Sequence, residues 1–282
     1  MALSLCLAGC KTLNSGDVTG SIPDGAGRDA ALQRDANALS KRYTENPQDK
    51  NTAISYAAVL RQRSQFAQAV AVLQGIAIKN PQDKEILGAY GKALADAGRL
   101  QEAADVLPRA HSPDNPNWTI LSAQGAVADR LGDHATARSY YNAALKIVPG
   151  EPSVLSNLGL SYTLTKELPK AEQALRQAAE SPRADSRVRQ NLSMVLSLEG
   201  KYAEAEQLGA RDTTPEQAAA NVNAVKRMAA QSDSWRDLRG LDKTKTASVK
   251  TPNGSGNSVA ARAPDDNAAP AARASGAAAL AN

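Results

Sequence analysis

Small residues recur at a fixed spacing of 34 positions along the middle of the chain. One series consists of alanine alone, at Ala69, Ala103, Ala137, Ala171 and Ala205. A second series has the same spacing and also carries only small residues, at Ala57, Gly91, Gly125, Gly159 and Ser193. A constant period of this length predicts a stack of repeated units, in which each unit buries an apolar face against its neighbours.

Larger apolar residues between the small ones predict two helices in each unit. The units are counted from Lys50, Lys84, Trp118, Pro152 and Ser186. The first helix is mostly apolar at position 7 (Tyr56, Tyr90, Gln124, Leu158, Leu192) and at position 11 (Leu60, Leu94, Ala128, Tyr162, Leu196). The second helix carries Leu73, Leu107, Tyr141 and Leu175 at position 24, where the fifth unit has Gly209.

Turn residues separate the predicted helices. Gly98, Gly132 and Gly200 lie between the two helices of their units, where a residue that tolerates positive φ is favoured. Prolines lie at or next to position 32, where each second helix is expected to end, at Pro81, Pro116, Pro149 and Pro182.

This pattern of small and large positions resembles the tetratricopeptide repeat (TPR). The resemblance implies an all-α fold, a TPR α-solenoid of about five helix-turn-helix repeats over residues 50–212. It also implies that the protein acts by binding other proteins on a concave surface lined by the first helices.

Segments on both sides of the repeats are predicted to cap them. Residues 28–49 form a capping helix with apolar residues at helical spacing. Residues 213–239 form a second one, because Thr214 and Pro215 are typical of a helix start. Its apolar stripe is Ala219, Val222, Val225, Met228 and Ala229, and the alternative role for this helix is to bind a partner. Residues 240–282 are rich in Ala, Pro, Gly, Ser and Asn, and predict a disordered tail.

The N-terminal residues Leu7, Ala8, Gly9 and Cys10 resemble a bacterial lipobox, which implies lipidation of Cys10. Residues 1–9 then form a truncated lipoprotein signal peptide, and residues 10–27 a flexible polar linker. The expected positively charged region is missing, so either the true start lies upstream or the tetrapeptide is a coincidence. Lys11 favours the outer over the inner membrane.

Composition and charge exclude several classes of function. The net charge is +4, but acidic and basic residues are mixed along the helices, so no nucleic-acid partner is expected. Both cysteines lie within the first ten residues, and His111 and His134 stand alone at predicted turns. No metal site, cofactor, small-molecule substrate or catalytic motif is therefore expected, and the protein is predicted not to be an enzyme.

The first-helix positions 2, 5, 6 and 9 predict a partner-binding surface that is polar and only weakly basic. Its candidate residues are Asn51, Glu85, Lys92, Thr119, Ser122, Ser156, Asn157, Arg187, Gln190, Asn191 and Met194. The alternative for each is a solvated helix face. The carboxylate clamp of chaperone-binding TPR proteins is not reproduced, since Ile54, Ala58, Gly88 and Ala126 occupy the clamp positions.

The lipobox, the polar linker, the repeats and the tail together resemble the TadD family, TPR lipoproteins of the Tad (Flp) pilus assembly machine. The resemblance implies a pilotin-like or scaffold role at the periplasmic face of the outer membrane, held there by the lipid anchor alone. The implied partners are the secretin and other Tad components. Two alternatives remain: another outer-membrane TPR lipoprotein that assists envelope assembly, or a cytosolic TPR scaffold or chaperone adaptor.

Overall fold

The regular elements of the described residues are helices. The structure, a computed structural model, describes residues 25–246, with side chains for residues 27–231, and contains no β-strand there. The predicted all-α repeat fold is confirmed. The helices are α1 (Gly25–Glu45), α2 (Lys50–Gln62), α3 (Phe66–Lys79), α4 (Lys84–Asp96), α5 (Leu100–Val106), η1 (Leu107–Ala110, a 3-10 helix), α6 (Trp118–Arg130), α7 (His134–Ile147), α8 (Pro152–Leu164), α9 (Leu168–Ala179), α10 (Ser186–Leu198), α11 (Tyr202–Gly209) and α12 (Pro215–Thr246).

The chain divides into two units, Met1–Gln231 and Ser232–Asn282. The first unit holds all the repeats, and the described part of the second is the C-terminal end of α12. Cys10, the predicted signal segment and the predicted tail beyond residue 246 lie outside the described residues.

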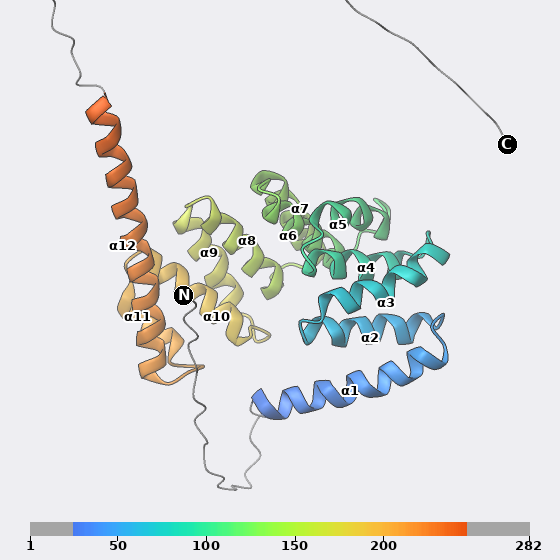
Figure 1. The fold of residues 1–282 in the computed structure, drawn as a ribbon. Helices are drawn as coiled ribbons and strands as arrows, with labels where there is room; N and C mark the ends of the chain where they lie inside the picture. Colours follow the sequence, from blue (N-terminus) through green and yellow to red (C-terminus); the bar gives the residue numbers. More distant parts are fainter. Residues whose placement is uncertain (1–24, 247–282) are drawn as a thin grey trace, which may run out of the picture. The chain divides into compact units, whose positions relative to one another are not determined.

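Five helical hairpins follow one another through the first unit, from α2 and α3 to α10 and α11 (Figure 1). The first helices begin at Lys50, Lys84, Trp118, Pro152 and Ser186, the residues from which the 34-residue period is counted. Each first helix contacts the next first helix, whereas the described second helices contact first helices and not one another. The first helices α2, α4, α6, α8 and α10 therefore line one face of the stack, which we call the first-helix face.

A third periodic series explains where each first helix starts. The residue before each of these helices has a side-chain oxygen that accepts a hydrogen bond from a backbone N–H in the first turn. Such N-caps satisfy donors that have no partner within the helix. The series is Asp49, Asp83, Asn117, Glu151 and Asp185.

Small and large side chains are paired across the second, third and fourth hairpins. A Cβ atom added to Gly125 would lie 2.5 Å from the ring of Tyr141, and one added to Gly159 would lie 2.6 Å from Leu175. In the fifth hairpin both positions carry small residues, Ser193 and Gly209. There α12 fills the space, because a Cβ on Gly209 would lie 3.2 Å from the Cβ of Ala218.

The helix α12 differs from its prediction in two respects. Of the predicted apolar stripe, Val222 is buried, but Met228 is 70% exposed. The helix also continues to Thr246, past residue 239 where the predicted capping helix ended. The sequence allows this continuation, because no proline lies between Pro215 and Pro252. The single glycine in this range, Gly240, costs only about 1 kcal/mol in a helix.

A carboxylate whose side chain is only 9% exposed joins the third and fourth hairpins. Asp129 of α6 accepts hydrogen bonds from the Tyr141 hydroxyl of α7 (3.0 Å) and the Ser161 hydroxyl of α8 (2.8 Å). The Nδ1 atom of His134 lies 2.8 Å from the same carboxylate. Burial, and then the charge of Asp129, raise the pKa of Tyr141 above its ordinary value, so its hydroxyl stays a donor.

The turn between the helices of each hairpin places one residue in the left-handed region. Glycine occupies this position in three hairpins, at Gly98, Gly132 and Gly200, with φ of 79°, 88° and 82°. Ser64 and Lys166 hold the equivalent position with φ of 58° and 64°. A residue with a Cβ atom pays roughly 1–2 kcal/mol for this conformation.

Replacing Lys166 by glycine should therefore stabilise the protein by about 0.5–1 kcal/mol, since relief of the left-handed strain exceeds the extra entropy of glycine in the unfolded chain. The urea midpoint, followed by circular dichroism at constant m, measures the change. The matched control is Gln173→Gly at an exposed site within α9, which should lose about 1 kcal/mol. Equal losses for both variants would contradict the prediction.

Candidate functional site

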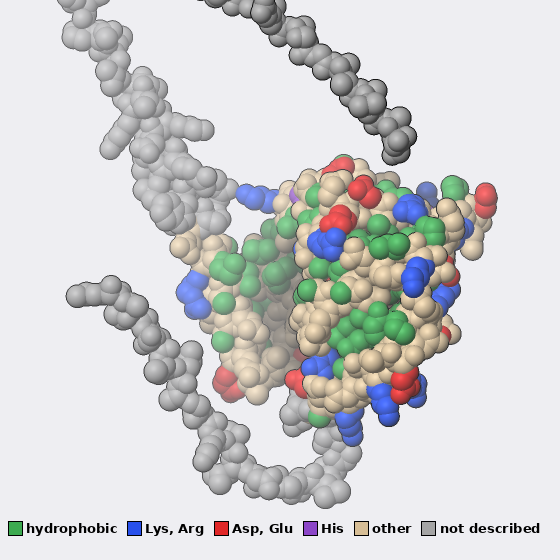
Figure 2. Space-filling model, turned by 45° about the vertical axis from the view of Figure 1, so that its right-hand side comes forward, with side chains coloured by type: hydrophobic (Ala, Val, Ile, Leu, Met, Phe, Trp, Pro, Cys, Tyr) green, Lys and Arg blue, Asp and Glu red, His purple; other side chains and the backbone are tan. Residues whose placement is uncertain are grey.

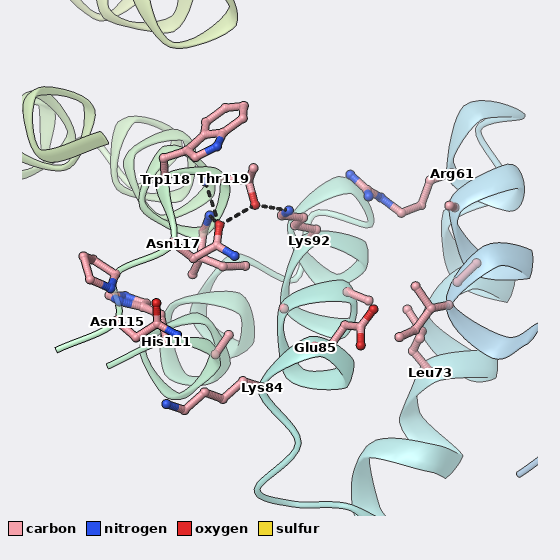
Figure 3. Close-up of a pocket in the computed structure, with 18 residues that line it drawn as sticks. Arg61, Leu73, Lys84, Glu85, Lys92, His111, Asn115, Asn117, Trp118 and Thr119 are labelled. Atoms are coloured by element: carbon pink, nitrogen blue, oxygen red, sulfur yellow. Dashed lines mark hydrogen bonds between the residues drawn. The ribbon is translucent and has the colours of Figure 1, made fainter. Parts of the chain in front are cut away.

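A hollow on the first-helix face lies between α2, α4 and α6, and we call it the Lys92 pocket. It has a volume of about 610 Å³. Figure 2 shows one face of the described residues, on which acidic and basic side chains are interspersed and hydrophobic side chains gather between them. The lining of the Lys92 pocket (Figure 3) includes Ile54, Ala58, Arg61, Lys84, Glu85, Ala89, Lys92, His111, Asn115, Asn117, Trp118 and Thr119.

An irregular segment between the second hairpin and α6 borders the pocket. The helix α5 stops at Val106, and a short 3-10 helix that contains Pro108 follows it. Proline cannot donate the backbone hydrogen bond that would continue the α-helix. Residues 111–117 then cross to α6 as an irregular segment, in which Ser112 and Asn115 form an isolated bridge.

A directed chain of hydrogen bonds holds the ammonium of Lys92. Its Nζ donates to Thr119 Oγ1 (2.9 Å), and that hydroxyl donates in turn to Asn117 Oδ1 (2.9 Å). Asn117 is fixed because it also caps α6. Lys92 is half-buried, and among the described residues no carboxylate lies within ion-pair distance of its Nζ. Burial, and then the charge of Arg61, lower the pKa of Lys92 from its ordinary value.

Of the other charged groups around the pocket, Arg61 and Glu85 are paired with opposite charges, whereas Lys84 donates to Ser112 Oγ (3.1 Å). Arg61 Nε lies 2.6 Å from Asp96 Oδ2. Glu85 Oε2 lies 2.7 Å from Lys50 Nζ, and hydrogen bonding to Glu85 and then Asp83 raises the pKa of Lys50. In Figure 3, Arg61 from α2 points toward Lys92 from α4, and Glu85 lies on the far side of the pocket from Thr119. The end of the pocket near Lys92 is therefore positively charged.

A second hollow lies between α8 and α10 and differs in chemistry. Its volume is about 440 Å³. The two arginines that line it are paired with carboxylates, Arg183 with Glu151 at 3.0 Å and Arg187 with Asp185 at 2.9 Å. No cation of this hollow is left without a charged partner, so it lacks the feature that distinguishes the Lys92 pocket.

The described residues contain neither a candidate metal site nor a candidate membrane-spanning helix. Within that range, no three His, Cys, Asp or Glu side chains are grouped as metal ligands would be. His111 Nε2 lies 3.1 Å from Gln124 Oε1, so this histidine is held by an amide of α6. None of the helices in the described part is long and apolar enough to span a membrane.

Comparison with known proteins assigns the repeats to a family. A family model described as tetratricopeptide repeat matches residues 57–116, 109–152 and 122–186. Residues 57–186 are tetratricopeptide repeats. No curated protein sequence matches the chain.

Solved TPR structures share the fold. PilW is 15% identical with a TM-score of 0.59, and the match covers 69% of this chain and 92% of PilW. PilF of Pseudomonas aeruginosa is 16% identical with a TM-score of 0.53, over 70% of this chain and 91% of PilF. A thermophilic TPR protein of Thermus thermophilus is 20% identical with a TM-score of 0.51, over 63% of this chain and 93% of that protein. At these identities the likeness concerns the fold alone.

The residues predicted for the partner-binding surface of the TPR stack fall into three groups. Glu85, Lys92 and Thr119 line the Lys92 pocket, and Ser156, Asn157, Arg187 and Asn191 line the second hollow. Asn51 and Gln190 are exposed outside both. Ser122 and Met194 also lie outside both, and Met194 packs against the buried core of the last repeat.

Two residues of the predicted partner-binding surface are buried and not exposed to a partner. Ser122 is 9% exposed and Ser156 is 6% exposed. Each hydroxyl accepts a hydrogen bond from an asparagine of the next first helix, Asn157 to Ser122 at 3.2 Å and Asn191 to Ser156 at 2.9 Å. These two serines therefore form hydrogen bonds between the first helices of neighbouring repeats.

Several residues that line the Lys92 pocket do not occupy the first-helix positions 2, 5, 6 and 9, from which the partner-binding surface was predicted. Arg61 lies at the end of α2, and Trp118 is the first residue of α6. His111, Asn115 and Asn117 line the pocket from the segment that follows the 3-10 helix of the second hairpin. The signal for this segment was its proline content, Pro108, Pro113 and Pro116 within a single second helix and turn.

The protein is a TPR-containing scaffold for protein–protein interaction.

Proposed function

We propose that this scaffold is a lipid-anchored protein on the periplasmic face of the outer membrane, with a pilotin-like role in Tad (Flp) pilus assembly. Its first-helix face holds a segment of the secretin or of another pilus component, and the lipid on Cys10 keeps that complex at the membrane. A diacyl anchor with an added amide-linked chain is sufficient for stable attachment, because each buried methylene contributes roughly 0.8 kcal/mol.

The open Lys92 pocket carries the binding part of the proposal. Its half-buried cation has no carboxylate partner among the described residues, and apolar side chains line other parts of the pocket. A site of this kind is suited to a partner, because the partner can supply the missing charge. The lipobox of residues 7–10 supports the location. PilW, which has the same fold, is described as a widely conserved type IV pilus biogenesis factor, so this arrangement of repeats occurs in a pilus protein.

Deleting the gene in its own host should lower the amount of secretin multimer in the outer membrane and abolish Flp pili. Immunoblots of heat-resistant multimers and electron microscopy of cells measure the two effects. Complementation with the wild-type gene should restore both. Cys10→Ser should restore neither and should not incorporate labelled palmitate, whereas Cys6→Ser, which leaves the lipobox tetrapeptide intact, should behave as wild type.

Normal multimers and normal pili in the deletion strain would refute the pilus role. Palmitate incorporation into Cys10→Ser would refute the anchor. Palmitate labelling together with normal pili would favour another outer-membrane lipoprotein function, and absence of labelling in the wild type would favour the cytosolic scaffold.

A further inference from the structure

We infer that the Lys92 pocket binds an extended peptide segment of a partner protein that carries an aspartate or glutamate side chain flanked by apolar residues. The inference rests on the proposed protein-binding function of the first-helix face and names the chemistry of the bound segment. It concerns a site formed by α2, α4, α6 and the segment 111–117.

The charge of the pocket requires an anion. Lys92 Nζ can donate three hydrogen bonds, and the described residues provide one acceptor, Thr119 Oγ1. The hydroxyl hydrogen of Thr119 is directed at Asn117, so its lone pair is fixed toward the lysine. Two donors of Lys92 remain for a ligand. A half-buried ammonium without a counter-charge is costly, and a carboxylate from a partner removes that cost.

A carboxylate fits the anion better than a phosphate, because the half-buried end of the pocket holds one cation without a carboxylate partner among the described residues, Lys92. The second such cation of the lining, Lys84, is exposed and donates to Ser112 Oγ at 3.1 Å. Phosphate sites commonly use an arginine that binds two oxygens at once. The nearby Arg61 already lies 2.6 Å from Asp96, and Lys50 is occupied by Glu85 and Asp83. A single lysine held by a hydroxyl matches the charge of one carboxylate. Glu85 stands on the opposite side of the pocket and excludes a second acidic residue there (Figure 3).

The remainder of the pocket is suited to aliphatic or aromatic neighbours of the acidic residue. Ile54 and Ala58 of α2 and Ala89 of α4 are half-buried and line one side, and Trp118 lies at the α6 side. These side chains offer apolar area with little conformational freedom to lose on binding. A volume of about 610 Å³ in an open groove accommodates a short extended segment and not a folded domain.

Selection of peptides from a random heptapeptide library displayed on phage tests the inference on the full chain. Wild type should enrich peptides with one Asp or Glu next to apolar residues. Lys92→Met should lose the enrichment of acids, and Lys92→Glu should reverse it toward Lys or Arg. Lys79→Met, at an exposed lysine of α3, is the matched control and should enrich the same acidic peptides as wild type.

A second measurement requires no variant of the protein. The most enriched peptide should bind wild type at least roughly tenfold more tightly than its Glu→Gln or Asp→Asn counterpart, because a hydrogen bond to a charged group is being lost. Its affinity should fall as salt is raised. Added inorganic phosphate should displace it no better than chloride at equal ionic strength.

The inference would be overturned by any of these results: no enrichment of acids on wild type, the same enrichment on Lys92→Met, equal binding of the amide peptide, or displacement by low phosphate. If acidic peptides are enriched only after Asp265→Asn and Asp266→Asn, the occupant is the acidic pair of the chain itself, which also overturns it. The pilus phenotype is read separately. If wild type selects acidic peptides but the deletion strain has normal pili, only the proposed function is refuted. If the deletion strain loses its pili but wild type selects no acidic peptides, only this inference is refuted.

Discussion

Replacing Gly125 by leucine is expected to unfold the stack or to lower its free energy of unfolding by more than about 3 kcal/mol. Overpacking a core site costs typically about 1–3 kcal/mol, and here three conditions raise the cost. Even a Cβ atom would lie 2.5 Å from the ring of Tyr141. The ring cannot swing away freely, since its hydroxyl is bonded to Asp129. Asp129 is in turn bonded to Ser161 of the next hairpin, so displacement spreads to the neighbouring interface.

Thermal melting followed by circular dichroism, together with urea titration, measures the effect of Gly125→Leu. The matched control is Gly75→Leu, because Gly75 also lies within a helix but has no atom within 4 Å of its added Cβ. There the change should be neutral or should stabilise by up to about 1 kcal/mol, since glycine is a poor helix former. If Gly125→Leu melts within a few degrees of wild type, position 8 of the repeat is not the close contact that the register requires.

The same close contact explains why the fold could be predicted from the sequence. A small residue at position 8 opposes a large one at position 24, and this requirement leaves a signal in every hairpin that has it, as in Gly91 with Leu107. The N-cap acceptors recur with the same period, and Asp83 and Asp185 could have been recognised from spacing alone. Such local rules repeat, so five weak signals reinforce one another.

The candidate site could be predicted only in part, because it depends on a departure from the repeat. Position rules identified Lys92 and Thr119 as surface residues, yet their contact bridges two repeats and has no local signature. The segment 111–117, which supplies part of the pocket lining, is irregular and departs from the helical pattern of the repeat. Position rules also placed Ser122 on the surface, where close packing of first helices buries it. Cys10, on which the location depends, lies outside the described residues.

The carboxylate of Asp129 should contribute the largest polar term to the stability of the described stack. Asp129→Ala is expected to lower the free energy of unfolding by about 3–5 kcal/mol, because it leaves the hydroxyls of Tyr141 and Ser161 without their acceptor. Asp105→Ala is the matched control, at an exposed aspartate of α5, and should change stability by no more than about 0.5 kcal/mol. Urea unfolding at neutral pH measures both.

A double-mutant cycle separates loss of the hydrogen bonds from simple loss of packing. In the wild-type background, Tyr141→Phe removes one donor to Asp129 and should cost about 1 kcal/mol. In the Asp129→Ala background the same change removes a buried hydroxyl that has lost its acceptor, so it should be neutral or stabilising. If Tyr141→Phe costs the same in both backgrounds, Asp129 holds the hairpins together through its packing and not through its carboxylate.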